Sequence, residues 1–327
     1  MEFKISKPVA MFEMGSRKNQ EDSIFPENGQ ASDSDRLFLV CDGMGGHEHG
    51  EVASGIVCKE MSRYLGESVA NSGVLADEDI THALELVYDA LEPYNTKSAK
   101  KMGTTMTMAC LHQGGCTVAH IGDSRIYHIR PETKEVLYRS RDHSLVFDLY
   151  RAEEITYDEM RTSPRKNIIT KAIQPGGKGS VRPDIVHIGN LKKGDYLFLC
   201  SDGVLEEMED DELVDILAAK CSDEDKIKEM IKLTAGNADN HSAYLIHIED
   251  VMKGDGEIVA DDEANSPCNA VNIIKRLGGP KAKKNGKPDS KGKGINNDNP
   301  KRNIWTVLVL LVAIIAVIAI LFKLLAK

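Results

Sequence analysis

The chain has 327 residues, of which 41% are hydrophobic and 28% are charged, and its net charge is −10 at pH 7. This length suits one large domain or two ordinary ones, and the hydrophobic fraction excludes a disordered chain. The seven cysteines are odd in number and form no C-x-x-C pair, so we expect reduced core thiols and no disulfide framework.

The predicted elements alternate between strands and helices along the chain. Strands are predicted at 4–13, 36–41, 104–111, 116–121, 125–130, 135–140, 183–188, 195–201 and 242–249. Helices are predicted near 48–66, 78–92 and 210–235, and short helical pieces in the polar segment 144–168. Period-two alternation, as in TMTMAC, indicates antiparallel strands. This order favours helices packed outside two sheets over strict βαβ winding.

The stretch CDGMGGHEHGEVAS at residues 41–54 follows the apolar run RLFLV and places an acid at the tip of a buried strand. Three interpretations compete: a strand-to-helix turn capped by Asp42, a phosphate-binding loop, and a metal site built on carboxylates. The phosphate loop fails, because neither glycine-rich phosphate motif is present and no Lys or Arg lies near enough. An acidic loop instead points to divalent cations, which prefer oxygen ligands.

Acids at other predicted strand ends extend this pattern. Glu21 and Asp22 follow the first strand, Asp123 lies between two strands, Asp202 ends the run YLFLC, and Asp239 precedes the last strand. Taken singly, each is more often a turn residue or a helix cap than a ligand. Gathered at one end of a sandwich they would repel one another strongly, so two divalent metal ions are the simplest explanation.

Seven motifs occur in the order seen in the metal-dependent PPM (PP2C-type) protein phosphatases, over residues 5 to about 249. They are Arg17 with Glu21-Asp22, Asp42-Gly43-Met44-Gly45-Gly46-His47, Gly103-Thr104-Thr105, Gly122-Asp123-Ser124-Arg125, Asp142-His143-Ser144, Ser201-Asp202-Gly203 and Asp239-Asn240. The chain resembles the bacterial branch most, because of DGMGGH and NIITKAI. The resemblance implies an α+β fold, a four-layer α-β-β-α sandwich of two antiparallel sheets with helix pairs outside.

The resemblance also implies how the acids share two Mn²⁺ or Mg²⁺ ions. By analogy Asp42 bridges both ions, and the carbonyl of Gly43 is a further ligand. Asp202 and Asp239 would hold one ion. The implied function is a protein serine/threonine phosphatase, in which a metal-bridged hydroxide attacks the phosphorus of a phosphoserine or phosphothreonine monoester. The alternative is an inactive family member that binds phosphopeptides as a regulator.

The remaining implied site residues surround this core. Glu21 and Asp22 would serve the second ion, partly through water, and Asp123 would bind a third, more weakly held ion. Arg17 would grip the substrate phosphate as a bidentate cation. No cysteine is assigned a nucleophilic role.

One position departs from the animal members of the family. They carry a histidine directly after the Asp-Gly of this loop, proposed as the general acid, and here that position is Met44. His47 matches the bacterial pattern, and we expect it to be structural, so the source of the leaving-group proton stays open. Gly45 and Gly46 are expected to let the backbone fold tightly against the two cations.

Two further segments receive weaker expectations. Asp142-His143-Ser144 looks catalytic in isolation but lies away from the metals in the family, so we expect it to be structural. Residues 145–166 align with the flap beside the family's active site. Arg151, Arg161 and Arg165 in this flap could help a phosphopeptide dock, although a solvated face is the more frequent role of such residues.

The C-terminal part of the chain predicts membrane attachment. After a phosphatase domain at 1–250, residues 251–303 read as an acidic and then basic flexible linker. Residues 304–322 are uncharged and about long enough to cross a bilayer, and Lys301 and Arg302 precede them. We expect a single-pass anchor with a cytoplasmic catalytic domain, since no secretory signal opens the chain. The implied partners are phosphoproteins and a eukaryotic-like Ser/Thr kinase, and no nucleic acid.

Overall fold

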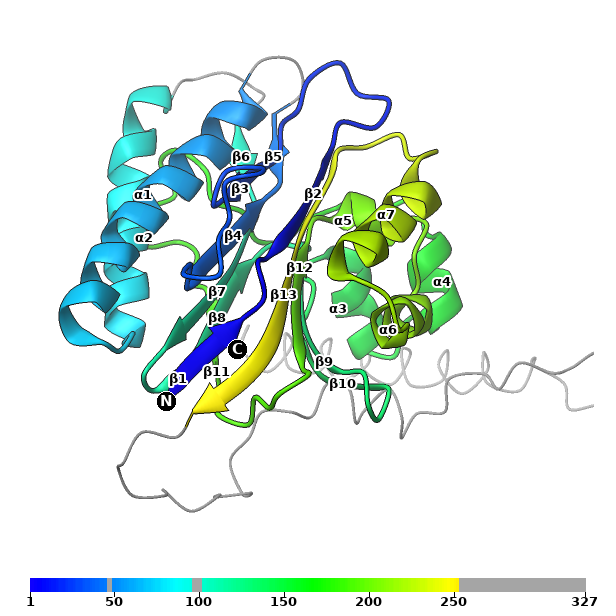
Figure 1. The fold of residues 1–327 in the computed structure, drawn as a ribbon. Coiled ribbons are helices and arrows are strands. Elements are labelled where there is room, and N and C mark those ends of the chain that lie inside the picture. Colours follow the sequence, from blue (N-terminus) through cyan, green and yellow to red (C-terminus); the bar gives the residue numbers. More distant parts are fainter. Residues whose placement is uncertain (46–48, 96–101, 253–327) are drawn as a thin grey trace, which may run out of the picture. The chain divides into compact units, whose positions relative to one another are not determined.

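Two antiparallel β-sheets form the centre of the computed structural model, which describes residues 1–45, 49–95 and 102–252 (Figure 1). The first sheet has the order β1 (Glu2–Ile5), β13 (His241–Met252), β12 (Tyr196–Cys200), β9 (Arg125–Arg130) and β10 (Glu135–Arg139), and β2 (Val9–Glu13) also pairs with β13. The second has the order β11 (Asp184–Ile188), β8 (Gly115–Ile121), β7 (Met106–His112), β4 (Leu37–Cys41) and β3 (Ser23–Phe25). A small ribbon pairs β5 (Gly43–Met44) with β6 (Gly103–Thr104).

The alternation of side chains along the strands builds three separate cores, one between the sheets and one beneath the helices of each sheet. In β4, Phe38 and Val40 face the other sheet and pack into the core between the sheets. Leu37, Leu39 and Cys41 face the opposite way and pack into the core beneath helices. Strand β12 of the first sheet alternates in the same manner between the inter-sheet core and a third, helix-covered core. Both sheets are therefore buried on two faces, which explains their nearly continuous apolar sequences.

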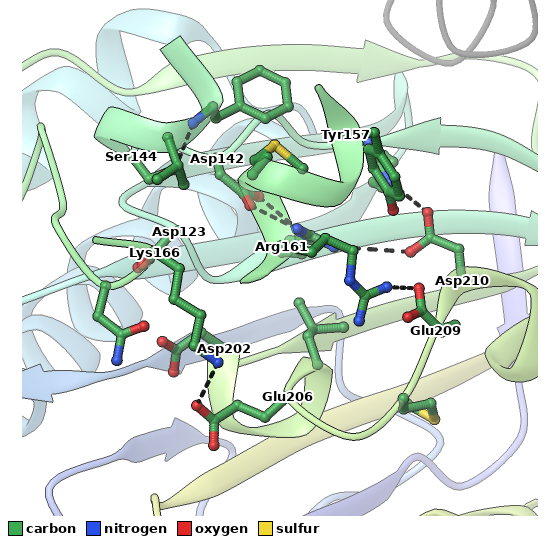
Figure 2. Close-up of a pocket in the computed structure, with 18 residues that line it drawn as sticks. Asp123, Asp142, Ser144, Tyr157, Arg161, Lys166, Asp202, Glu206, Glu209 and Asp210 are labelled. Atoms are coloured by element: carbon green, nitrogen blue, oxygen red, sulfur yellow. Dashed lines mark hydrogen bonds and ion pairs between the residues drawn. The ribbon is translucent and has the colours of Figure 1, made fainter. Parts of the chain in front are cut away.

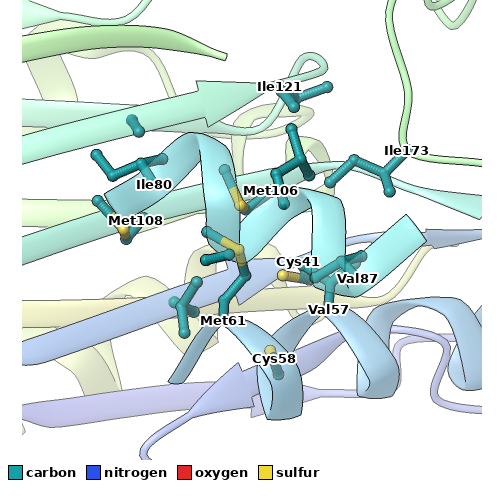
Figure 3. Packing of buried hydrophobic residues seen from close by; sticks show 14 of the residues in the cluster. Cys41, Val57, Cys58, Met61, Ile80, Val87, Met106, Met108, Ile121 and Ile173 are labelled. Atoms are coloured by element: carbon teal, nitrogen blue, oxygen red, sulfur yellow. The ribbon is translucent and has the colours of Figure 1, made fainter. Parts of the chain in front are cut away.

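Helices cover the outer face of each sheet (Figure 1). Helices α1 (Gly50–Ser72) and α2 (Asp77–Leu91) pack on the second sheet, and a 3-10 turn (Glu92–Tyr94) follows them. Figure 3 shows Met61 and Val57 of α1 beside Ile80 and Val87 of α2 in this core. Helices α6 (Asp210–Ala218) and α7 (Asp223–Thr234) cover the first sheet. The predicted four-layer α-β-β-α arrangement is confirmed.

Residues 145–166 form a small unit with two short helices, which we call the flap. The helices are α3 (Leu145–Arg151) and α4 (Tyr157–Thr162), and they share a hydrophobic cluster of Val146, Phe147 and Met160. Each begins at a polar cap, because Ser144 accepts from the backbone of Phe147 and Thr156 forms a capping box. The expectation of short helical pieces in this polar segment is confirmed.

The differences from the predicted elements have local causes. The strand expected at 4–13 is split into β1 and β2, because Pro8 offers no N–H to the ladder. Both pieces still pair with β13. The helix expected to end near residue 66 continues to Ser72 and stops at Gly73, which adopts the left-handed conformation of a C-cap. Strands β3, β5 and β6 are too short for alternation to reveal them.

The predicted linker and membrane span, residues 251–303 and 304–322, lie almost entirely outside the described residues, which end at Met252. Within the described part of the chain, no helix combines the length and the hydrophobicity needed to cross a bilayer.

Candidate active site

Five aspartates converge where strands of both sheets end. Asp42 follows β4 and Asp22 precedes β3 in the second sheet, whereas Asp202 follows β12 and Asp239 precedes β13 in the first. Asp123 lies in the turn between β8 and β9, which links the two sheets. Each carboxylate lies close enough to feel the charge of at least one other. The fold thus gathers acids that are up to about 220 positions apart in the sequence.

The environment of these acids disfavours their charged forms. Burial raises the pKa of Asp42 well above its usual range, and repulsion from Asp22, Asp202 and Asp123 adds to the effect. Burial likewise raises the pKa of Asp22 to about 7, against a hydrogen bond of 3.0 Å donated by Ser201 Oγ. The pKa values of Asp123 and Asp202 are also raised, chiefly by burial. Without positive charge, the cluster cannot be fully ionised near neutral pH.

The donor set fits hard divalent cations. The side chains present only carboxylate oxygens, which Mg²⁺ and Mn²⁺ prefer. Asp22 and Asp123 are buried, whereas the other three aspartates are half-buried. One oxygen of Asp123, Oδ1, is buried without a hydrogen-bond partner among the described residues. Most buried polar atoms in proteins have such a partner, so this oxygen is unusual. A cation at this point would satisfy that oxygen and offset the mutual repulsion.

Asn240 fastens the loop that carries Arg17, Glu21 and Asp22. Its side-chain amide donates to the carbonyl oxygens of Met14 and Asn19 at 2.9 and 3.0 Å and accepts from the backbone N–H of Glu21 at 2.8 Å. Both amide hydrogens and the amide oxygen of Asn240 therefore bind this loop. The sequence places Asn240 in the Asp239-Asn240 motif but does not indicate this role. An amide directly after Asp239, just before a predicted strand, was the available signal.

Arg17 lies at the edge of the cluster and pairs with one of its members. Its Nη2 donates to Asp239 Oδ2 at 2.6 Å, and about half of the Arg17 side chain is exposed. The hydrogen bond with Asp239, and also the charges of Glu21 and Asp42, raise the pKa of Arg17. A guanidinium in this position is available to an incoming phosphate while it remains tied to the carboxylates.

The glycines that follow two of the aspartates allow very close packing. A Cβ on Gly43 would overlap the carbonyl oxygens of Glu21 and Gly50, and a Cβ on Gly203 would overlap that of Asn240. Gly45, which the sequence analysis singled out, is less tightly placed, because its Cβ would meet Gly50 N at 3.3 Å. The closest approach in this turn is therefore at Gly43. Gly46 and His47 lie outside the described residues.

Thr105 is a second residue whose task the sequence did not reveal. Its hydroxyl accepts from the backbone N–H of Asp42 at 3.0 Å and lies 2.7 Å from the hydroxyl of Ser124. Its own N–H donates to the carbonyl of Asp42 at 2.9 Å. One buried threonine thus links Asp42 to Ser124, the residue that follows Asp123. Nothing in the composition of GTTM distinguishes such a strut from an ordinary strand residue.

A cavity of about 140 Å³ opens beside Asp123 and Asp202 (Figure 2). The flap forms one wall and the segment from α5 (Asp202–Leu205) to α6 forms the other. Two ion pairs cross between these walls, Arg161 with Glu209 and Lys166 with Glu206 at 3.2 Å. Arg161 therefore lines this cavity and is paired, whereas Arg151 and Arg165 are exposed.

A separate group of side chains also has the composition of a metal site. His120, His143 and Asp184 offer ligand atoms within 4.8 Å of one another. The two imidazole rings are stacked, however, with an interplanar angle of 6°, so their in-plane lone pairs do not point to one common ion. His143 Nδ1 also accepts from the N–H of Gly122, and His143 Nε2 faces Asp184 at 3.2 Å and Lys171 Nζ at 3.1 Å, so both ring nitrogens are already engaged. We therefore place the candidate metal centre at the aspartates.

The chain matches the family model described as Protein phosphatase 2C over residues 15–235. It is 32% identical over 217 residues to the protein phosphatase PhpP of Streptococcus pneumoniae, an alignment that covers 65% of this chain and 86% of PhpP. Among the described residues, the family match spans all five strands of the second sheet, strands β9, β10 and β12 of the first, and the whole aspartate cluster except Asp239.

Solved structures show the same similarity. The serine/threonine phosphatase Stp1 from Staphylococcus aureus is 30% identical, with a TM-score of 0.62, and the alignment covers 76% of this chain and 98% of Stp1. The catalytic domain of the phosphatase PstP, solved in complex with two manganese ions, aligns with a TM-score of 0.58 at 24% identity. At this identity the second comparison concerns the fold alone.

Proposed function

This chain belongs to the protein phosphatase 2C family of serine/threonine protein phosphatases, and we propose that the aspartate cluster carries its reaction by holding divalent cations. The observation that supports this proposal most directly is the crowding of carboxylates in a buried place, where burial first and mutual repulsion second raise the pKa of four of them. Structural ion pairs would lower these values instead. A cluster of this kind is stable in its ionised form only with cations between its members.

Each acid has a proposed place around the cations, either Mn²⁺ or Mg²⁺. Asp42 lies centrally among the acids and would contact both core ions, together with the carbonyl of the next residue, Gly43. Asp202 and Asp239, from the first sheet, would hold one ion. The other ion would be held from the second sheet by Glu21 and Asp22, in part through water. A third, weaker ion would use Asp123, whose Oδ1 has no partner among the described residues.

The substrate phosphate would be bound by Arg17. Its guanidinium projects from a loop that Asn240 fixes, so little conformational entropy is lost when it binds an anion. When bound, paired divalent cations acidify a water molecule and neutralise the charge on a phosphoryl group. The residues around them keep this arrangement rigid, because Thr105 fixes the backbone of Asp42 and Ser201 fixes the carboxylate of Asp22.

A direct assay tests this function. The purified full-length chain is incubated with a chromogenic phosphate monoester and with a phosphothreonine peptide, in Mn²⁺ and in chelator. We expect hydrolysis of both substrates in Mn²⁺ and a loss of at least about 100-fold in chelator, because charge neutralisation is the largest catalytic contribution. Equal rates in the two conditions would contradict the metal-dependent mechanism.

We further propose that residues 304–322 anchor the protein in a membrane with the catalytic residues in the cytoplasm. The support is the uncharged stretch of nineteen residues and the basic pair Lys301 and Arg302 before it. Anchoring would favour membrane-proximal phosphoproteins, such as a eukaryotic-like Ser/Thr kinase, as substrates. Membrane fractionation with protease added from either side tests the orientation, and recovery of the intact chain in the soluble fraction would argue against an anchor.

A further inference from the structure

The segment Asp142-His143-Ser144 lies between β10 and α3, and Asp142 lines the same cavity as Asp123 and Asp202, but the proposed reaction gives these three residues no role. Its three residues nevertheless bind the chain on both sides of Asp123 and the start of the flap. The contacts are specific enough to assign a task to a motif that the proposed chemistry leaves unused.

His143 holds both backbone groups of Gly122, the residue before Asp123. The N–H of His143 donates to the carbonyl of Gly122 at 2.9 Å, and the N–H of Gly122 donates to His143 Nδ1 at 3.1 Å. Gly122 has a φ of +106°, and a Cβ there would collide with the side chain of Thr105. The turn therefore has one conformation, and His143 satisfies its buried hydrogen-bonding groups.

Asp142 holds the chain on the other side of Asp123. Its two carboxylate oxygens accept from Nε and Nη2 of Arg125 at 2.7 and 2.6 Å, a bidentate pair at the first residue of β9. Both side chains are largely buried, so the pair is well shielded from water. Asp123 thus lies between Gly122, which His143 holds, and Arg125, which Asp142 holds.

Ser144 joins the same segment to the flap. Its hydroxyl accepts from Phe147 N at 3.3 Å and caps α3. The backbone of Ser144 pairs with that of Ile169 in an antiparallel bridge. The outer edge of His143 is fixed as well, because its Nε2 faces Asp184, which also pairs with Lys171 at 3.1 Å. The flap and the Asp123 turn are therefore mounted on three consecutive residues.

We propose that His143 and Asp142 are positioning residues that hold Asp123 in the geometry needed to bind its cation. This inference rests on the proposed function, since it assumes that Asp123 is a ligand. The reason is mechanical: if Gly122 N–H loses its acceptor, a buried donor stays unsatisfied and the turn relaxes toward another partner. The Asp123 carboxylate then moves away from its place. The other four aspartates come from other segments, and Asp42, which is linked to this turn through Thr105, keeps its own backbone bonds to that residue.

Two variants of His143 separate the contacts. In His143→Asn the side-chain oxygen takes the place of Nδ1 and still accepts from Gly122. In His143→Gln the amide nitrogen takes the place of Nε2 and faces Asp184, but the acceptor for Gly122 is lost. Calorimetric titration of Mn²⁺ into the full-length protein in detergent counts the bound ions and measures the affinity of each. We expect wild-type binding in His143→Asn, and a weakest site about tenfold weaker in His143→Gln, with the tighter sites unchanged.

The outcomes that overturn the proposal are distinct. Wild-type Mn²⁺ binding in folded His143→Gln, or equal weakening in both variants together with equal loss of thermal stability, would reduce the motif to a packing role. If His143→Gln does not fold, Arg125→Lys decides, because it removes the bidentate contact of Asp142; wild-type binding there refutes the proposal. Absence of Mn²⁺ binding in the wild type would overturn the proposed metal chemistry itself, and this inference with it. If the wild type binds Mn²⁺ and the variants bind it with the same affinities, the positioning role alone would be overturned.

Discussion

Single acidic residues of the site lie in surroundings that disfavour their charged forms. Asp42 is surrounded by Asp22, Asp202 and Asp123, and both burial and repulsion raise its pKa. An ordinary turn residue at a strand end would be solvated and would show no such effect. Holding these carboxylates together lowers the stability of the folded protein, and packing elsewhere offsets this loss. Such a locally unfavourable arrangement is expected where it serves function.

Asp42→Asn is expected to lower phosphatase activity by about 100-fold or more while the protein remains folded. The amide keeps the shape of the side chain but is a poor cation ligand, and outer contacts of metal sites alone are worth 10–100-fold. The rate of hydrolysis in Mn²⁺ and the near-UV circular dichroism check both parts. Cys200→Ser is the control, because Cys200 is buried at the end of β12 and has no proposed role in the chemistry. Similar losses in both variants would argue against a specific role of Asp42.

The raised pKa of Asp22, about 7, gives a pH dependence of stability in chelator. A carboxyl group whose pKa is raised on folding stabilises the protein below its unfolded pKa of about 3.9, and this contribution disappears as the pH rises toward 7. Asp22→Asn removes the effect. We expect the variant to be more stable than the wild type at pH 8, and the difference to be much smaller at pH 4. Urea unfolding at both pH values measures the difference, and a difference independent of pH would contradict the assignment.

At the scale of elements, the turns after β4 and β12 set how closely the acids approach one another. Both strands end in an aspartate followed by glycine, and in both cases the glycine packs on a backbone oxygen of a neighbouring segment. After Asp42 the chain forms the short strand β5, whereas after Asp202 it enters the helix α5. The shared requirement is therefore contact distance and not a common secondary structure.

Gly203→Ala is expected to destabilise the protein by at least about 3 kcal/mol, because the added methyl group would overlap the carbonyl of Asn240. The shift would also displace Asn240 and with it the loop of Arg17. Gly236→Ala is a matched control, since a Cβ there has no atom within 4 Å and the residue lacks a positive φ. Thermal unfolding of the two variants compares them directly. Equal midpoints would show that the turn after β12 can relax.

At the scale of the whole molecule, the candidate metal centre joins the two sheets. Asp22 and Asp42 belong to the second sheet, and Asp202 and Asp239 belong to the first. The core between the sheets holds them together over most of their length, but at this end charge repulsion opposes that packing. Cations placed among the acids would therefore stabilise the folded state as a whole.

Mn²⁺ is expected to raise the thermal midpoint of the full-length protein. A ligand that binds only the folded state stabilises it by about 2.7 kcal/mol for each site when its concentration is 100 times the dissociation constant. Calorimetric scans with and without Mn²⁺ measure the shift, and Asp42→Asn should abolish most of it. An equal shift in this variant would mean that Mn²⁺ stabilises the protein elsewhere.

The sequence by itself determined the layers of the fold and the kind of chemistry. Alternating apolar residues fixed the strands, and aspartates at their ends predicted oxygen ligation, since both signals are local. Tertiary structure alone decided which groups support those acids. The tasks of Asn240, Thr105 and His143 depend on contacts with residues 19 to 226 positions away along the chain, which no local pattern records. Tertiary structure also decided that, between the two described glycines of this turn, Gly43 and not Gly45 has the closest backbone contact. Steric overlap depends on which backbone lies opposite, and that is set by how the segments pack.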